Sequence, residues 1–164
     1  MECMHPITNK FPGGVFMHVR KLCMNDLMRS IEYDFFVLIC QAFPLLEFLG
    51  VVSSVEQKKR PNKLDEHEQT SSAIEYSHLM TLHLIMAHVD YTKQFLLDSN
   101  IRLPRLNELF VDYANFANVT ENFTSDVVHA KCEKLKTIIF SRPPSTIEKN
   151  VFRYFPSVVI SIWC

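Results

Sequence analysis

The segment Leu103–Val111, LPRLNELFV, carries the pattern that decides the fold. An anchor residue, Leu103, is followed by apolar residues three, six and eight positions later, here Leu106, Leu109 and Val111. Because side chains in a strand alternate between faces, the final pair points to one side of a short strand, and the turn before it carries the earlier two to the same side. The segment therefore predicts a turn that leads into a half-buried strand.

The same pattern recurs along the chain. The copies are Phe16–Met24, Phe43–Val51, Tyr76–Leu84, Leu103–Val111 and Cys132–Phe140, with a weaker sixth in Phe155–Trp163. The anchors at positions 16, 43, 76, 103, 132 and 155 are separated by 27, 33, 27, 29 and 23 residues. Four of these five steps fall within the roughly 20–29 residues that are typical of a leucine-rich repeat. The Asn or Cys that usually follows the strand is mostly missing, which predicts irregular repeats.

Three segments between the copies have apolar residues at helical spacing. The stripes are Ile31, Phe35, Leu38 and Ala42, then Tyr91 and Phe95, then Phe116, Val119 and Phe123. We expect Asp90 to cap the second helix at its N-terminus. The sequence thus predicts an α/β leucine-rich-repeat solenoid, short and irregular, with parallel strands on a concave face and helices on a convex face. The alternative is a plain α/β domain whose parallel strands happen to resemble one another.

The chain divides into an N-terminal tail, 1–14, and one repeat domain, 15–164. The longest step contains a stretch with few apolar residues, 53–72, which has a basic half and an acidic half and predicts a mobile surface insertion. Its basic run Lys58–Arg60 is either a solvated charge run or a nuclear import signal. The sequence ends inside the apolar segment 160–164, so we expect an incomplete repeat array.

Composition excludes several classes of function. The 164 residues carry a formal net charge of −1, which gives no electrostatic reason to bind nucleic acid or an anionic membrane. Five scattered cysteines without a Cys-x-x-Cys pair argue against a disulfide framework and for a reducing compartment. With no secretory signal at the N-terminus, we expect the protein in the cytoplasm, and the basic run leaves the nucleus open.

The chain lacks the local motifs of catalysis. No nucleophile-elbow, zinc-protease or phosphate-loop pattern is present. His78, His83 and His88 are spaced by five, whereas helical metal ligands need spacings of three or four. We therefore expect no catalytic residue, no metal and no cofactor. The aromatic residues Phe16, Phe43, Tyr76 and Trp163 are expected in the core.

Several segments resemble the irregular leucine-rich part of invertebrate F-box proteins. They are Val19–Leu22 with Asp34–Phe36, Phe43–Leu46, Leu103–Leu109, Asn122–Thr124 with Cys132–Lys136, and Tyr154–Ser157. The resemblance covers roughly positions 12–158. It implies a substrate-recognition arm of a ubiquitin ligase, in which an F-box docks on a Skp1-type adaptor. No F-box precedes Phe16 in this sequence, so binding of that adaptor requires an F-box outside this chain.

Alternation along the strands predicts which residues face the concave side. The expected partner-binding residues are Cys23, Phe48, Val52, Thr81, His83, Ile85, Glu108, Phe110, Asp112, Thr137 and Ile139. The middle row is unusually apolar for a surface, so it is either a groove for a protein partner, with Phe110 as its anchor, or a face covered by another part of the chain or a second copy. The sequence favours a non-enzymatic protein-binding module, with an inactive truncated scaffold paralogue or a small α/β enzyme as the alternatives.

Overall fold

The computed structural model describes residues 14–25, 31–57, 73–147 and 149–163. Within them the chain alternates between short strands and short helices. The elements are β1 (Lys21–Asn25), α1 (Tyr33–Ala42), β2 (Phe48–Val52), β3 (Ile74–Glu75), β4 (Thr81–Leu84), α2 (Val89–Leu97), β5 (Ile101–Arg102), β6 (Glu108–Asp112), α3 (Tyr113–Val119), α4 (Asp126–Lys131), β7 (Thr137–Ser141), α5 (Lys149–Tyr154) and β8 (Val159–Trp163). The fold is therefore α/β, as the sequence predicts.

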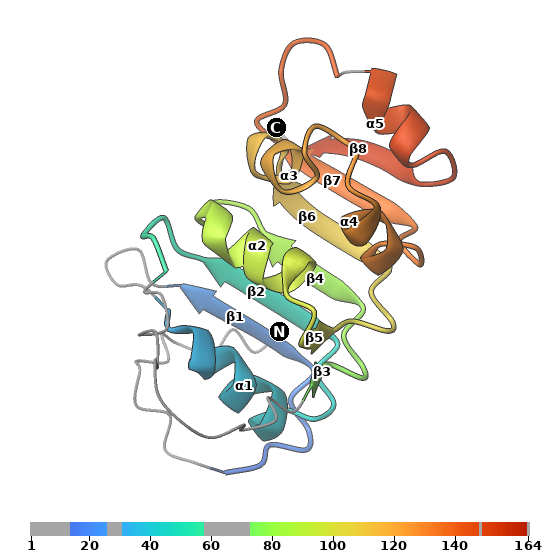
Figure 1. The fold of residues 1–164 in the computed structure, drawn as a ribbon. Coiled ribbons are helices and arrows are strands. Elements are labelled where there is room, and N and C mark those ends of the chain that lie inside the picture. Colours follow the sequence, from blue (N-terminus) through green and yellow to red (C-terminus); the bar gives the residue numbers. More distant parts are fainter. Residues whose placement is uncertain (1–13, 26–30, 58–72, 148, 164) are drawn as a thin grey trace, which may run out of the picture.

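Six of the strands form one parallel sheet in the order β1-β2-β4-β6-β7-β8, which follows the order of the chain. Figure 1 shows β1 and β8 at opposite ends of this sheet. The two shortest strands, β3 and β5, pair with each other in a separate parallel ladder. Strands of successive copies of the sequence pattern therefore lie side by side in the large sheet.

The register of the sheet aligns equivalent positions of the repeated pattern. Leu82 lies opposite Leu109, and Leu109 opposite Ile138. The same row extends through Leu49 to Leu22 at one end and reaches Ile160 at the other. The sixth strand begins four residues after its anchor Phe155 instead of five, so that Val159 pairs with Thr137.

Two main-chain hydrogen bonds recur in successive copies. In the first, the amide three residues after an anchor donates to the anchor carbonyl, as Leu106 N does to Leu103 O at 3.2 Å. The same bond is made at Leu46, Leu79, Leu135 and Val158. In the second, the carbonyl before a strand accepts two amides of the following copy, as Met80 O does from Asn107 N and Glu108 N. The repeated sequence therefore forms a repeated turn and not only a repeated strand.

The hydrophobic core lies between one face of the sheet and the helices, which Figure 1 shows along that face. The last two apolar positions of each of the first five copies are buried, with no residue above 4% exposed. On the helices, Phe36 packs edge-on against Phe95 with ring centroids 5.1 Å apart. Further along the sheet, Phe116 makes tilted ring contacts with Phe140 of β7 and with Phe155, at centroid distances of 5.7 Å and 5.9 Å. Aromatic rings thus fill the space between the two layers.

The helices differ in detail from their predicted stripes. Leu38 is 48% exposed, and Phe36 and Ile39 of α1 are buried in its place. The cap of α2 is His88, whose side chain accepts from Asp90 N, so the assignment of the cap to Asp90 is wrong. Phe123 is buried but follows α3, because Glu121 to Phe123 adopt positive φ angles and end the helical path.

The expected tail, 1–14, and insertion, 53–72, lie almost wholly outside the described residues, as does the basic run Lys58–Arg60. Of the insertion only 53–57 is described, and Ser53 there is fully buried, where its hydroxyl accepts from Tyr91 Oη at 3.3 Å. The start of this segment therefore belongs to the packed fold.

Candidate functional site

The face of the sheet opposite the helices carries the residues that alternation predicts for it. Cys23 is exposed, and most of the others are partly exposed. These are Phe48, Val52, Thr81, His83, Glu108, Phe110, Thr137 and Ile139. The middle row runs through Cys23, Gly50, His83, Phe110 and Ile139, which are register partners on adjacent strands. We call this surface the helix-free face.

Four rings form an aromatic cluster on the helix-free face: Phe48, His83, Phe110 and Trp163. His83 is at its centre, with ring centroids 5.0 Å from Phe110, 5.3 Å from Trp163 and 6.3 Å from Phe48. Phe110 and Trp163 meet edge-on at 6.1 Å. These distances and angles lie in the range that favours aromatic pairs. The cluster spans residues from β2 to β8 and so links most of the sheet on its helix-free side.

His83 is the titratable group inside the aromatic cluster. Burial among the rings lowers the pKa of its imidazole, because removing water penalises the charged form. A neutral imidazole offers one donor and one acceptor. The centre of the helix-free face is therefore uncharged near neutral pH, and its polar ring atoms come from His83 and from the indole N–H of Trp163.

Charges on the helix-free face are few and partly paired. Thr81 Oγ1 donates to Glu108 Oε2 at 3.2 Å across β4 and β6. Lys21 lies exposed at the start of β1, in the same register row. Near this end of the strands, Arg20 and Glu47 form an exposed ion pair of 2.9 Å. The face therefore offers an apolar centre with a polar margin, the arrangement found at protein interfaces.

Two residues predicted on this face are not accessible. Ile85 is 8% exposed and Asp112 3% exposed, so the expectation that they face solvent is wrong. Both follow the last core position of their strands, where the chain leaves the sheet; Ile85 precedes Met86, which has a φ of 62°. Gly50 is also buried, because the side chains of Cys23 and Phe48 lie over it.

Asp112 belongs to a polar cluster at the ends of β6 and β7. Its carboxylate accepts from the Ser141 hydroxyl and from two nitrogens of Arg142. These bonds satisfy the buried carboxylate, and they fix the chain where β7 ends and Arg142 adopts a φ of 48°. The cluster is a structural support at the margin of the helix-free face.

Sequence reasoning placed Trp163 in the core, and this expectation is wrong. The side chain is 48% exposed and lies in the aromatic cluster on the helix-free face. The alternation along β8 carries the missing signal, since Ile160 and Ile162 occupy the core-facing positions opposite Ile138 and Phe140. Their neighbour Trp163 must then point to the other face.

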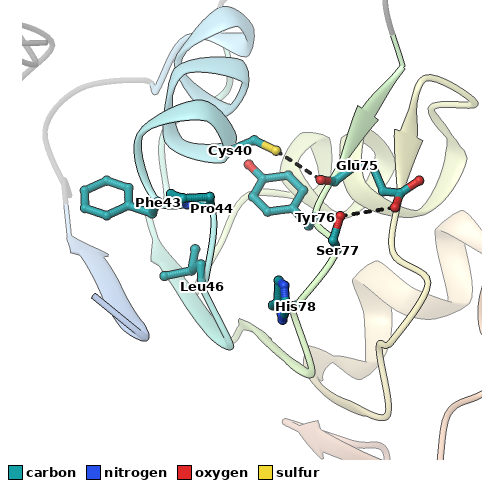
Figure 2. Close-up of a pocket in the computed structure, with 8 residues that line it drawn as sticks. All are labelled: Cys40, Phe43, Pro44, Leu46, Glu75, Tyr76, Ser77 and His78. Carbon is teal, nitrogen blue, oxygen red and sulfur yellow. Dashed lines mark hydrogen bonds between the residues drawn. The ribbon is translucent and has the colours of Figure 1, made fainter. Parts of the chain in front are cut away.

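A small pocket opens between the end of α1 and the segment that precedes β4 (Figure 2). Its volume is about 110 Å³, below the roughly 300–1,000 Å³ of a typical ligand site. The Cys40 thiol donates to Glu75 O at 3.3 Å, and burial together with Glu75 raises its pKa. The thiol therefore stays protonated at neutral pH, which disfavours nucleophilic chemistry.

A larger groove, about 520 Å³, lies between β5 and α4. Two lysines at its edge bond to main-chain carbonyls: Lys131 Nζ to Phe95 O and Asp98 O, and Lys134 Nζ to Pro104 O. Lys131 thereby places a positive charge at the C-terminal end of α2, where the helix dipole favours a cation. Desolvation lowers the pKa of Lys131. Both lysines therefore have structural roles at the edge of the groove.

Among the described residues, no group of three or more His, Cys, Asp and Glu side chains could hold a metal ion. His78 lies in the turn before β4, His83 on β4, and His88 at the start of α2. The described cysteines Cys23, Cys40 and Cys132 form no disulfide. In the described part of the chain, no helix is both long and apolar enough to span a bilayer.

Comparison with known proteins gives no assignment. No protein-family model matches the chain, and searches of curated proteins and of solved structures found no significant match.

Proposed function

We propose that this chain is a short, irregular leucine-rich-repeat solenoid whose helix-free face binds another protein. Support for the repeat arrangement comes from the turn bond that recurs from copy to copy and from the carbonyl that accepts two amides of the following copy. Steps of 27, 29 and 33 residues between the anchors leave both arrangements in place. An ordinary parallel sheet with unrelated strands has no reason to repeat them.

The observation that carries the binding role is the partly exposed aromatic cluster of Phe48, His83, Phe110 and Trp163. Aromatic side chains at the centre of an apolar patch are the commonest anchors of protein interfaces. Trp163 has 48% of its surface exposed although it touches two other rings. A partner that covers this cluster would remove the remaining apolar surface from water.

An enzymatic role has less support. A small-molecule site needs a concave pocket with convergent polar groups, often with a shifted pKa that suits catalysis. The pocket beside Cys40 holds a thiol whose pKa is raised, which is the wrong direction for a nucleophile. The two lysines of the larger groove, Lys131 and Lys134, are engaged with main-chain carbonyls.

The resemblance to F-box proteins suggests the kind of partner, a protein that such an arm would present for ubiquitination. Docking of a Skp1-type adaptor would need an F-box supplied outside this sequence. The lack of disulfides at Cys23, Cys40 and Cys132 suits the reducing cytoplasm, where we place the protein.

The test is affinity capture from lysate with three forms of the chain. The native form is compared with a Phe110→Asp, Ile139→Asp double variant and with a Leu97→Asp, Val127→Asp control. The control residues are 40% and 63% exposed on α2 and α4, so it adds the same charges on the helix side. We expect a partner that the native form and the control retain, and that the first variant binds roughly 30-fold more weakly or worse.

Circular dichroism shows whether each variant keeps its fold. Equal capture by all three folded forms would disprove binding by the helix-free face. If no form captures a specific protein, an inactive scaffold becomes the better explanation. Unfolding of the Phe110 variant would show that this ring is part of the core.

A further inference from the structure

The strand β8 is an edge of the large sheet, and it is entirely uncharged. Its sequence, Val159–Trp163, reads VISIW. Natural edge strands are usually protected from pairing by charged residues, proline or bulges. The opposite edge, β1, carries Lys21 and exposes only polar residues and Cys23. No described residue pairs with the outer side of β8.

The side chains of β8 are exposed even where the register assigns them to the core. Ile162 lies opposite Phe140, yet Ile162 is 51% exposed and Phe140 is fully buried. On the other face, Val159 is 61% and Trp163 48% exposed. The nearby helix α5, which Figure 1 places beside β8, adds Phe152 at 54%. Apolar surface is thus concentrated at this end of the sheet.

The main-chain groups of β8 alternate between the sheet and the open edge. Val159 N donates to Lys136 O of the preceding copy at 2.8 Å, so Val159 faces β7. Because a strand residue directs its N–H and C=O to the same side and its neighbours direct theirs to the other, Ser161 also faces β7. Ile160 and Ile162 therefore direct their donors and acceptors toward the open edge.

We propose that β8 pairs antiparallel with β8 of a second copy of this chain, about a two-fold axis at Ser161. Ile160 then lies opposite the partner's Ile162, and the partner's Ile160 lies opposite Ile162. Both are hydrogen-bonded pairs, since these residues have their main-chain groups on the open edge, and each pair exchanges two bonds, giving roughly four in all. Ser161 lies opposite its own copy, where a small side chain fits on the axis.

In this antiparallel arrangement the side chains of the two β8 strands are also complementary. The sequence of β8 is symmetric in character about Ser161, with an isoleucine on each side and an apolar residue beyond each isoleucine. A two-fold axis perpendicular to the sheet keeps corresponding faces together. Isoleucines therefore meet isoleucines on the helix side, and Val159 meets the partner's Trp163 on the helix-free face. This closed, self-complementary contact is the usual form of a homodimer interface.

A second β8 fits this edge better than the β1 edge of another copy. In a head-to-tail arrangement the core-facing residues of β8 would meet Leu22 and Met24. These are only 1% and 4% exposed, so their burial would add almost nothing. Pairing two β8 strands covers exposed isoleucines on both sides. The proposal goes beyond the proposed protein-binding function. Trp163 of the aromatic cluster takes part in both, but the tests below measure molar mass and cross-linking and do not depend on another protein.

The first test measures molar mass by sedimentation equilibrium over roughly 1–200 µM protein, where dimer formation depends on concentration. We expect the native chain to form a dimer and an Ile162→Lys variant to remain a monomer. Ile162 is half exposed in the monomer, so the variant should still fold, which circular dichroism checks. A Val127→Lys control on α4 should dimerise like the native chain. A monomeric native chain, a dimeric Ile162→Lys variant, or growth beyond a dimer would overturn the proposal.

The second test fixes the register with a disulfide. In a background with Cys3, Cys23 and Cys164 replaced by serine, a Ser161→Cys variant places two thiols opposite each other. Their Cα atoms would be about 4.5 Å apart in a non-hydrogen-bonded pair, within the roughly 4.4–6.8 Å that a disulfide requires. We expect an intermolecular bridge on mild oxidation. A Val159→Cys control, with thiols more than about 13 Å apart, should not form one. Equal cross-linking of both variants would overturn the two-fold register.

Discussion

The guanidinium of Arg142 donates to both carboxylate oxygens of Asp112, at 2.6 Å to Oδ2 and 3.2 Å to Oδ1. The Asp112 side chain is 4% exposed and that of Arg142 is 75% exposed. Replacing Arg142 by alanine leaves a buried carboxylate with the Ser141 hydroxyl as its remaining side-chain donor. We expect the free energy of unfolding to fall by about 1–3 kcal/mol, the usual effect of removing one partner of a buried polar group.

Urea denaturation measures this change. Arg153→Ala on α5 removes another exposed arginine and should change stability by less than about 0.5 kcal/mol. If the two variants were equally stable, the contact of Arg142 with Asp112 would contribute nothing.

Two phenylalanines separate core packing from surface exposure. Phe116 is fully buried against Phe123, Phe140 and Phe155, whereas Phe152 is 54% exposed. Phe116→Ala should lower the free energy of unfolding by about 3–5 kcal/mol, through lost burial and the cavity left behind. Phe152→Ala should lower the free energy of unfolding much less, when measured at a low concentration at which the protein is a monomer. Similar losses for both would show that α3 does not pack as described.

The lowered pKa of His83 predicts a stability that depends on pH. The unfolded chain binds a proton at His83 near pH 6.5, whereas the folded chain resists that proton until a lower pH. Above this window both states are neutral at His83 and the group has no effect. As pH falls below about 6.5, the unfolded state gains protons first, so the folded state loses stability.

A His83→Phe variant removes this contribution and keeps an aromatic ring in the cluster. Urea denaturation at pH 7.5 and at pH 5.5 should show the native chain losing stability relative to the variant at the lower pH. The other six histidines are common to both proteins and cancel in the comparison. A stability difference that does not change with pH would contradict the burial of His83.

The turn after α3 holds three successive residues with positive φ: Glu121 at 52°, Asn122 at 57° and Phe123 at 64°. Residues other than glycine and asparagine are strained at such positive φ angles. Glu121 is exposed, so Glu121→Gly should remove the strain without loss of packing and raise the free energy of unfolding by about 1 kcal/mol. Glu133→Gly, at an exposed position without a positive φ, should not stabilise the protein. A destabilised Glu121→Gly variant would argue against a left-handed turn.

The sheet could be predicted from sequence because its pattern is local and repeated. The positions of Leu109 and Val111 in one copy match Leu82 and Leu84 in another, and all four are buried. The sixth strand shows the limit of the pattern. One residue fewer separates Phe155 from β8, and hydrogen bonding to β7 sets the register there.

Which residues are buried on the helices and at the margin of the helix-free face could be predicted less well from the sequence. Helical spacing favoured Phe35 and Leu38, but the direction from which the sheet contacts α1 buries Phe36 and Ile39 together with Phe35 and leaves Leu38 exposed. The burial of Asp112 depends on Arg142, thirty residues later, and no local pattern contains that contact. Sequence reasoning also assigned an aromatic residue such as Trp163 to the core on its chemistry, although its position in the strand places it on the other face.

In each of the first four copies, the carbonyl before the strand accepts two amides of the following copy. The acceptor residue and the first donor residue are 27 to 33 residues apart, yet the bonding is the same. Differences in length between a strand and the next turn therefore leave this main-chain bonding unchanged. Lineages of this chain can lengthen or shorten those connections without moving the side chains on the helix-free face. Residues on the helix-free face can thus change by substitution, while the connections change in length. Selection can act on these two kinds of change separately.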